Sequence, residues 1–175
     1  MHLKSGKIEI RNAEIADAPQ LTAWWNDGKV MAHAGFPNGL GTSAAEVVGQ
    51  IEHESDDTTR RHIIVYEGVP IGEMNYRNLG GNQCEMGIKI CDKKMQNRGI
   101  GKEVLSLFIR GLFNDLGYEL IKLDTDLKNE RAQHVYEKLG FRKIRVNQNA
   151  WKDQLGNDRS SVDYELTKDL FNSYL

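Results

Sequence analysis

Between a predicted strand and a predicted helix, the chain reads Gln96-Asn97-Arg98-Gly99-Ile100-Gly101-Lys102. The first backbone N–H groups of a helix lack intrahelical acceptors, and the helix dipole is positive at that end. Gly99 and Gly101 have no Cβ, so a diphosphate can approach the main chain, and Arg98 and Lys102 add positive charge. The segment therefore predicts a site for a phosphate-bearing ligand.

The spacing of this segment excludes two other phosphate-binding motifs. A P-loop would need Gly at position 96 and Ser or Thr at position 103, where this chain has Gln96 and Glu103. A dinucleotide-binding fingerprint would need Gly in place of Val104 and a position near the start of a βαβ unit. A tight turn into a helix, without a ligand, is the remaining alternative.

The residues that follow predict a long amphipathic helix from Gly99 to Leu116. Its apolar stripe is formed by residues that recur every four positions, namely Ile100, Val104, Phe108 and Leu112. Gly117 is expected to end the helix, because glycine readily adopts the left-handed conformation of a helix C-terminus.

The remaining patterns predict an α/β fold, with a mixed sheet of six to seven strands and helices on both faces. Strands are expected at Lys7–Arg11, His62–Tyr66, Ile71–Tyr76, Cys84–Ile90, Leu120–Thr125, Phe141–Val146 and Ser161–Leu166. Further helices are expected from Asp17 as N-cap through Trp25, from Thr42 or Ser43 through Ile51, and from Asn129 to Gly140. Residues 26–42 should form a loop with at most one helical turn.

Length and composition predict one domain, residues 1–175, with a core from 7 to 170. The 175 residues are 39% hydrophobic and 27% charged, as in an ordinary globular protein, and a formal charge of −2 gives no reason to expect nucleic acid as a partner. Without a membrane-length apolar run or a secretory signal, we expect a cytoplasmic protein with no membrane contact. Cys84 and Cys91 should be reduced thiols, and no ligand spacing predicts a metal.

Two motifs in fixed order resemble the GNAT superfamily of N-acetyltransferases. The family's loop pattern, Gln/Arg-x-x-Gly-x-Gly/Ala, is matched by residues 96–101. Further on, Asn129 is followed by Tyr136 and then by Leu139-Gly140-Phe141, as in the second half of the family's acetyl-CoA site. The resemblance is strongest over residues 83–142. Residues 24–27 and the acidic helix after them resemble the branch of ribosomal-protein N-terminal alanine acetyltransferases and some aminoglycoside acetyltransferases.

The resemblance implies a single-domain GNAT fold that binds acetyl-CoA as cosubstrate. In the family, two parallel strands splay apart beside the cofactor, and N–H groups of one strand hold the thioester and the pantetheine amides. The expected cofactor-binding residues are Ile88, Lys89, Ile90, Gln96, Asn97, Arg98, Gly99, Ile100, Gly101, Lys102, Asn129 and Tyr136. Asn129 also suits the N-cap of its helix, and the two roles are compatible.

Acetyl transfer to an amine benefits from a base and an acid. An alkyl ammonium with a pKa of about 10.4 is protonated at neutral pH, and the departing thiolate needs a proton. The resemblance implies an acidic residue on the strand entering the site, so Glu85 is the candidate base, with Asp92 and Glu73 as alternatives. Tyr136 is the candidate acid, as the matching Tyr is in many family members. A solvated carboxylate and a core phenol are the alternative interpretations.

The acceptor is predicted by class alone, as a primary amine on a small or aminoglycoside-like molecule or at a protein N-terminus. It should meet the first two helices and their loop, where Trp25, Asp27, His33 and Phe36 are candidate contacts. An exposed strand edge near the C-terminus would let two copies form a homodimer. The alternative to an enzyme is a non-catalytic GNAT-fold module that binds acyl-CoA for sensing, and Tyr136 favours the enzyme.

Overall fold

The computed structural model covers residues 1–175 and contains one eight-stranded sheet in the order β1-β2-β3-β4-β5-β6-β8-β7. The strands are β1 (His2–Ser5), β2 (Ile8–Asn12), β3 (Thr59–Tyr66), β4 (Val69–Gly80), β5 (Gln83–Ile90), β6 (Leu120–Asp126), β7 (Arg142–Lys152) and β8 (Asp158–Thr167). The α-helices are α1 (Ala18–Asn26), α2 (Gly28–Met31), α3 (Ala44–His53), α4 (Ile100–Asn114) and α5 (Glu130–Lys138). All neighbouring strands are antiparallel except β5 and β6, which are parallel.

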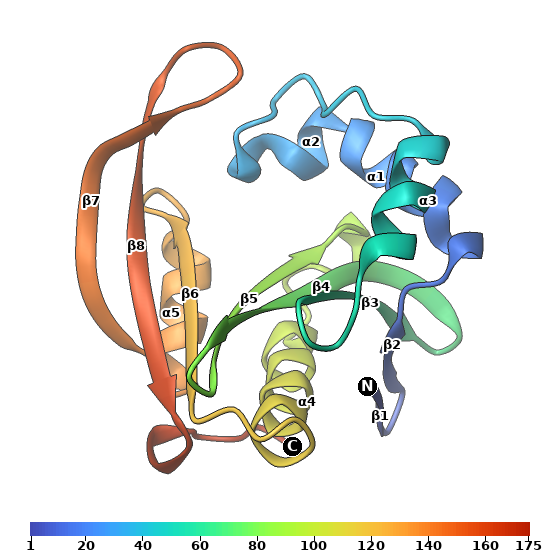
Figure 1. Cartoon of the computed structure of the whole chain (residues 1–175). Coiled ribbons are helices and arrows are strands. Elements are labelled where there is room, and N and C mark those ends of the chain that lie inside the picture. Colours follow the sequence, from blue (N-terminus) through green and yellow to red (C-terminus); the bar gives the residue numbers. More distant parts are fainter.

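Helices cover both faces of the sheet, with α1, α2 and α3 on one face and α4 and α5 on the other (Figure 1). The side chains of β3 alternate between these two layers. Ile63 and Val65 pack with Leu21 and Val47 of the α1–α3 layer, while Ile64 belongs to the larger core around α4. The predicted mixed α/β fold with helices on both faces is therefore confirmed.

The sheet has more strands than the six to seven that the sequence predicted. The pattern missed β1, because Leu3 is its only apolar residue. In the fold, β1 pairs with β2 and places Leu3 against Gly111 of α4, where an added Cβ would lie 2.8 Å from the Leu3 side chain. A short polar strand that fits against one glycine leaves no hydrophobic periodicity to detect.

Two predicted helix caps are formed and one is not. The hydroxyl of Ser43 accepts an N–H of α3 at 3.3 Å, and the side chain of Asn129 accepts an N–H of α5 at 3.2 Å. Asp17 precedes α1 but does not cap it through its side chain. Its carboxylate instead accepts two hydrogen bonds from the Arg11 guanidinium, at 2.8 and 2.9 Å. The same carboxylate also accepts the backbone N–H of Glu14 at 2.8 Å, so its acceptor positions are used by residues that precede α1.

Residues 26–42 contain slightly more helix than predicted. The carboxylate of Asp27 accepts the N–H of Lys29 at 2.8 Å and caps the single turn of α2, which continues into a 3₁₀ turn at Ala32–Ala34. Cys84 and Cys91 are free and buried. No helix in the fold combines the length and the apolar character needed to cross a membrane.

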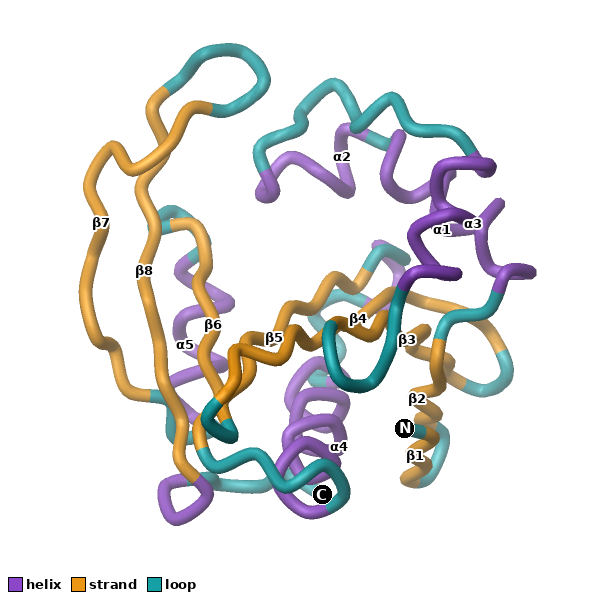
Figure 2. Tube along the Cα trace, viewed as in Figure 1, coloured by secondary structure: helices purple, strands orange, loops and turns teal.

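The parallel strands β5 and β6 pair only at their beginnings. Gln83–Glu85 pair with Leu120–Lys122, and the two strands then diverge (Figure 2). Diverging strands leave backbone groups without interstrand partners and open a space between them. This is the splay that the family resemblance implies, and it positions the site.

Candidate active site between the diverging strands

A cleft of about 1000 Å³ runs along the divergence of β5 and β6 and passes the N-terminus of α4. Most of the predicted cofactor-binding residues line it, namely Ile88, Lys89, Ile90, Gln96, Asn97, Arg98, Gly99, Gly101, Lys102, Asn129 and Tyr136. Ile100 is the exception, because its side chain is buried in the core beneath α4. Residues separated by more than forty positions in the sequence are therefore brought to one cleft.

The turn into α4 presents a row of free N–H groups to this cleft. No backbone N–H from Asn97 to Lys102 donates a hydrogen bond within the chain, and no side chain caps the helix. Gly99 has a φ of 78°, a left-handed conformation that suits glycine. A Cβ added to Gly99 or Gly101 would meet no atom within 4 Å, so both glycines face open space. The side-chain amide of Gln96 donates to Ile90 O at 2.9 Å and ties the turn to β5.

Basic side chains surround this row of N–H groups. Arg98, Lys102, Lys128 and Arg131 all line the cleft, and none of them forms an ion pair with a carboxylate. Arg131 instead hydrogen-bonds the side chain of Asn97. Uncompensated positive charge beside a helix N-terminus is suited to the phosphate groups of a ligand.

The open edge of β5 forms the next wall. In an antiparallel pair, successive N–H groups point alternately toward the partner and away from it. The N–H of Cys91 donates to Ile71 O at 2.8 Å, toward β4. The N–H groups of Ile88 and Ile90 therefore point away from β4, toward the space left by the divergence of β6. They can hold carbonyl oxygens of a ligand that lies between the strands.

Tyr136 projects from α5 into the cleft. Its ring is buried and packs against Phe141 and Tyr164, with centroids 5.7 and 6.0 Å away, and its hydroxyl makes no hydrogen bond within the chain. Burial, followed by the charge of Asp124, raises the pKa of Tyr136 to about 12. The ring is thus a core residue, while the protonated hydroxyl remains available as a donor in the cleft.

Asp124, which the sequence analysis missed, lies in the same cleft. Reduced hydration, followed by the charges of Glu85 and Asp163, raises the pKa of Asp124 above the usual value of a carboxyl. Asp124 stands at the carboxyl end of β6, the end of a strand at which α/β proteins commonly bind ligands. The residues Asp124-Thr125-Asp126 after the apolar part of this strand are the sequence signal that could have identified it.

The structure does not place the three carboxylates considered earlier on the cleft wall. Glu85 pairs with Arg77 at 3.1 Å. Asp92 accepts the N–H of Lys94 at 2.9 Å in the 3₁₀ turn Lys93–Met95. Glu73 is buried and fully paired: it accepts Trp25 Nε1 at 2.8 Å and has Arg61 Nε at 3.2 Å and Lys89 Nζ at 3.4 Å.

Of the four predicted acceptor contacts, His33 alone lines the cleft. Trp25 is buried in the α1–α3 core, and Phe36 packs against that core. The carboxylate of Asp27 is used as the cap of α2. Trp151 near the end of β7 and Lys29 in α2 also line the cleft, and neither was among the predicted acceptor contacts.

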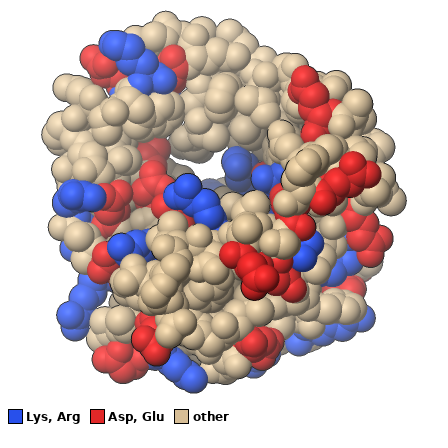
Figure 3. Space-filling model, viewed as in Figure 1, with Lys and Arg blue, Asp and Glu red and all other residues tan.

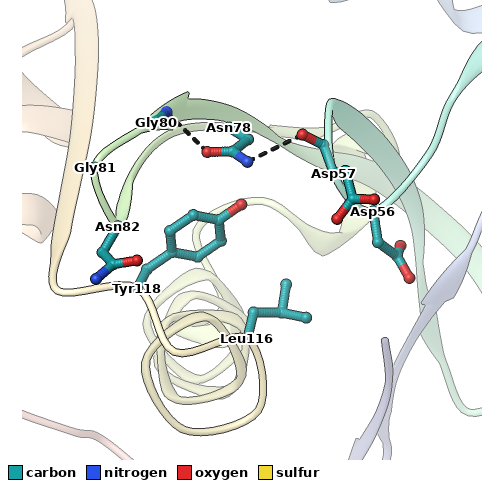
Figure 4. Close-up of a pocket in the computed structure, with 8 residues that line it drawn as sticks. All are labelled: Asp56, Asp57, Asn78, Gly80, Gly81, Asn82, Leu116 and Tyr118. Atoms are coloured by element: carbon teal, nitrogen blue, oxygen red, sulfur yellow. Dashed lines mark hydrogen bonds between the residues drawn. The ribbon is translucent and has the colours of Figure 1, made fainter.

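A second, smaller cavity of about 280 Å³ lies near the C-terminal end of α4 (Figure 4). It is lined by Asp56, Asp57 and Tyr118 and by no basic side chain. The side chain of Asn78 is occupied by hydrogen bonds to Gly80 N–H and Asp57 O, at 2.9 and 3.0 Å. This cavity does not suit a phosphate ligand, so the cleft between β5 and β6 is the candidate active site.

A known family model matches the greater part of the chain. Residues 7–142, well over half of the chain, match the family model described as an acetyltransferase (GNAT) domain. Among curated proteins, none matches the sequence of this chain.

Solved structures share the fold at low identity. The spermidine N-acetyltransferase from Vibrio cholerae, in complex with CoA and spermine, aligns with a TM-score of 0.84 and 19% identity over 95% of this chain and 98% of that one. A ribosomal L7/L12 alpha-N-protein acetyltransferase in complex with coenzyme A aligns with a TM-score of 0.84 and 14% identity over 97% and 99%. A probable acetyltransferase aligns with a TM-score of 0.82 and 21% identity over 97% and 98%.

Proposed function

This chain belongs to the GNAT acetyltransferase family, and from that premise we propose that it transfers the acetyl group of acetyl-CoA directly to a primary amine in a ternary complex. Membership of the family makes the chain an acyltransferase. The cosubstrate, the acceptor and the roles of individual residues are the content of the proposal.

The observation that carries the proposal is the row of free N–H groups from Asn97 to Lys102. These groups, with Arg98 and Lys102, would bind the diphosphate, since each phosphate oxygen can accept from a fixed N–H without displacing a side chain. The N–H groups of Ile88 and Ile90 would hold the pantetheine amides and the thioester oxygen. Asn129, beside the cleft at the start of α5, would complete the contacts.

Acetyl-CoA supplies an activated carbonyl, which a neutral amine attacks as the C–S bond breaks and the C–N bond forms. Tyr136 would give its phenolic proton to the departing sulfur, because its hydroxyl is protonated at neutral pH and faces the cleft. A backbone N–H at the edge of β5 would stabilise the negative charge on the carbonyl oxygen in the transition state. A free hydroxyl donor at this position favours an enzyme over a module that only binds acyl-CoA.

A carboxylate would take the proton of the ammonium before the attack. The second proton, which the nitrogen loses as the amide forms, would restore the phenol of Tyr136 after Tyr136 has protonated the sulfur. Asp124 is better placed than Glu85, because it lines the cleft and its raised pKa brings it closer to the working pH. Glu85 remains a candidate that would act through water, and its charge already contributes to the raised pKa of Asp124. The two carboxylates can be distinguished by the pH dependence of their variants.

We also propose that the chain forms a homodimer through β7, which is the edge of the sheet. Ile144 and Val146 of this strand are exposed at 49% and 41%. An edge strand with exposed apolar side chains is suited to pairing with a second copy. The mass in solution, measured by light scattering, tests the dimer: a monomer at all concentrations rejects it.

We also propose a cytoplasmic location, with which the two free, buried thiols of Cys84 and Cys91 are consistent.

Thermal unfolding with acetyl-CoA, and with ATP and NAD as controls, tests the proposed cosubstrate. Ligand at a hundred times its dissociation constant stabilises the folded state by about 2.7 kcal/mol. For a chain of this size, the unfolding midpoint should rise by roughly 5–10 °C. A rise with acetyl-CoA alone supports the site, and release of the CoA thiol on adding amines then tests turnover. A rise of the midpoint with ATP or NAD, or no rise with acetyl-CoA, rejects the proposed cosubstrate.

A further inference from the structure

Residues 170–175, which we call the terminal segment, pack against both helices that line the cleft. The side-chain amide of Asn172 donates to Lys138 O at 3.1 Å, which ties the segment to the end of α5. The N–H of Tyr174 donates to the hydroxyl of Ser106 at 3.0 Å, which ties the segment to α4. Figure 1 shows the C-terminus beside α4. The terminal segment therefore connects the two helices on the side of the sheet away from α1–α3.

Two features fix the terminal segment in place. Ser106 is fully buried and has the only polar side chain among the buried residues of α4, so its hydroxyl needs a partner inside the protein. The N–H of Tyr174 is that partner. On the other side, a Cβ added to Gly140 would lie 2.0 Å from Leu170 O, so the segment lies directly on the turn that ends α5. The backbone of Tyr174 is thus held firmly beside α4.

The aromatic ring of Tyr174 lies next to Lys102. The Lys102 ammonium is 4.7 Å from the centroid of the ring, within the range of a cation–π interaction. The hydroxyl of Tyr174 donates to Lys138 O at 3.4 Å, which restricts the rotation of the ring. Lys102 lies in the first turn of α4 and lines the cleft. The ring therefore contacts one of the positive charges that we propose to bind the diphosphate of acetyl-CoA.

The ring holds the ammonium without neutralising its charge. Lys102 forms no ion pair with a carboxylate. A carboxylate in the place of the ring would also hold the ammonium, but it would cancel the charge that attracts a phosphate. An aromatic face attracts the ammonium through its quadrupole and leaves N–H donors of the ammonium free. Figure 3 shows Lys and Arg side chains at the rim of the hollow near the middle of the molecule.

We propose that Tyr174 is a positioning residue for acetyl-CoA, because its ring holds the Lys102 ammonium beside the free N–H groups at the start of α4. This inference rests on the proposed cosubstrate. A lysine side chain that moves freely loses rotamer freedom when a phosphate immobilises it, and this loss weakens binding. Since the ring already restricts Lys102, less freedom is lost when the diphosphate binds.

A role in packing alone is the alternative for Tyr174, since its side chain also packs against the larger apolar core. The two roles differ in how they depend on Lys102. A packing role acts through the fold, so it is the same with or without the lysine. A positioning role disappears once Lys102 is removed. A double-mutant cycle therefore separates the two roles.

The test measures the dissociation constant of acetyl-CoA by calorimetric titration for the wild type, Tyr174→Leu, Lys102→Ala and the double variant. Tyr174→Leu should weaken binding by about three- to tenfold, and Lys102→Ala should weaken it at least as much, because the charge itself is lost. In the Lys102→Ala background, Tyr174→Leu should change the dissociation constant by less than about twofold.

Two further variants serve as controls. Tyr174→Phe keeps the aromatic face and should bind acetyl-CoA within about twofold of the wild type. Leu175→Ala changes the neighbouring residue, which is 46% exposed, and should behave as the wild type. Thermal unfolding without ligand is recorded for every variant, so that a loss of stability is known separately from a loss of binding. If Tyr174→Leu does not fold, Tyr174→Met gives the same comparison, because methionine fills irregular gaps without an aromatic face.

Unchanged or tighter binding by Tyr174→Leu overturns the positioning role. So does an equal loss of affinity with and without Lys102, or unchanged binding by Lys102→Ala. A wild type that does not bind acetyl-CoA at all overturns the proposed cosubstrate instead.

Discussion

Tyr136 and Asp124 both line the cleft, and the charge of Asp124 acts on the phenol: burial first, and then this charge, raise the pKa of Tyr136 to about 12. The pKa of Asp124 is itself raised, by reduced hydration and by the charges of Glu85 and Asp163. A phenol that keeps its proton and a carboxylate that can accept one are a suitable acid and base for the same reaction.

Tyr136→Phe should lower kcat by about 10²- to 10⁴-fold, the usual contribution of one proton-transfer group. The ring still fills the contact with Phe141 and Tyr164, so the fold and the dissociation constant of acetyl-CoA should be nearly unchanged. Steady-state kinetics and calorimetric titration measure the two effects. Loss of cosubstrate binding with unchanged turnover of the bound fraction would show that Tyr136 is structural.

Asp124→Asn and Glu85→Gln should have different pH profiles. The base must be deprotonated, so kcat/KM should fall as the pH drops through the raised pKa of Asp124. Asp124→Asn should lower the maximal kcat/KM of the pH profile and remove its decline at acidic pH. Glu85→Gln removes a charge that raises the pKa of Asp124. It should therefore move the acidic decline to lower pH and change the maximal kcat/KM only slightly. The reverse pattern would assign the base to Glu85.

Gly99→Asp should abolish acetyl-CoA binding, because it places a negative side chain where the diphosphate is expected. Gly68→Asp in the β3–β4 turn is the matched control: its φ is 82° against 78° for Gly99, and a Cβ at either position meets no atom within 4 Å. Both substitutions carry similar backbone strain, so both should lower the unfolding midpoint without ligand. The decrease should be smaller for Gly99→Asp, because its carboxylate lies at the positive end of α4 beside Arg98 and Lys102. If acetyl-CoA still stabilised Gly99→Asp against thermal unfolding, the assignment of the diphosphate to the free N–H groups from Asn97 to Lys102 would be contradicted.

The parts of the site that could be predicted from the sequence are those coded locally. Gly99, Gly101 and the amphipathic stripe of α4 lie within a few residues of one another, and a helix N-terminus follows directly from their pattern. Asn129 was likewise predicted as the cap that it forms.

The parts that could not be predicted depend on contacts between distant segments. Trp25 was expected to contact the acceptor. Its indole N–H instead donates to the carboxylate of Glu73, which is 48 positions away in the sequence, and this bond holds the ring in the core. Gln154 contacts Asn38 across 116 positions, and no periodicity records such a pair. Glu85 and Asp124 are both strand carboxylates, and the divergence of β5 and β6 decides which of them reaches the cleft.

His62 provides a prediction about stability. Its ring is fully buried against Phe108 and Tyr76, with centroids 5.1 and 5.8 Å away, and neither ring nitrogen has a hydrogen-bond partner. Burial, with a smaller contribution from the N-terminal ammonium, lowers the pKa of His62 to about 3. His62→Leu should be neutral or should stabilise the fold by about 1–3 kcal/mol at pH 7.5, because it removes unpaired polar atoms from the core.

The pH dependence of unfolding separates this burial cost from a simple packing change. Below a pH of about 6.5, His62 binds a proton in the unfolded chain. In the folded chain it binds one only when the pH approaches 3. Because of His62, the free energy of unfolding should therefore decrease by about 1.4 kcal/mol for each unit by which the pH falls between these two values. Urea unfolding at pH 7.5, 6.0 and 5.0 should show a shallower decline for His62→Leu than for the wild type. An equal slope in His62→Leu and in the wild type would mean that His62 already binds its proton in the folded protein.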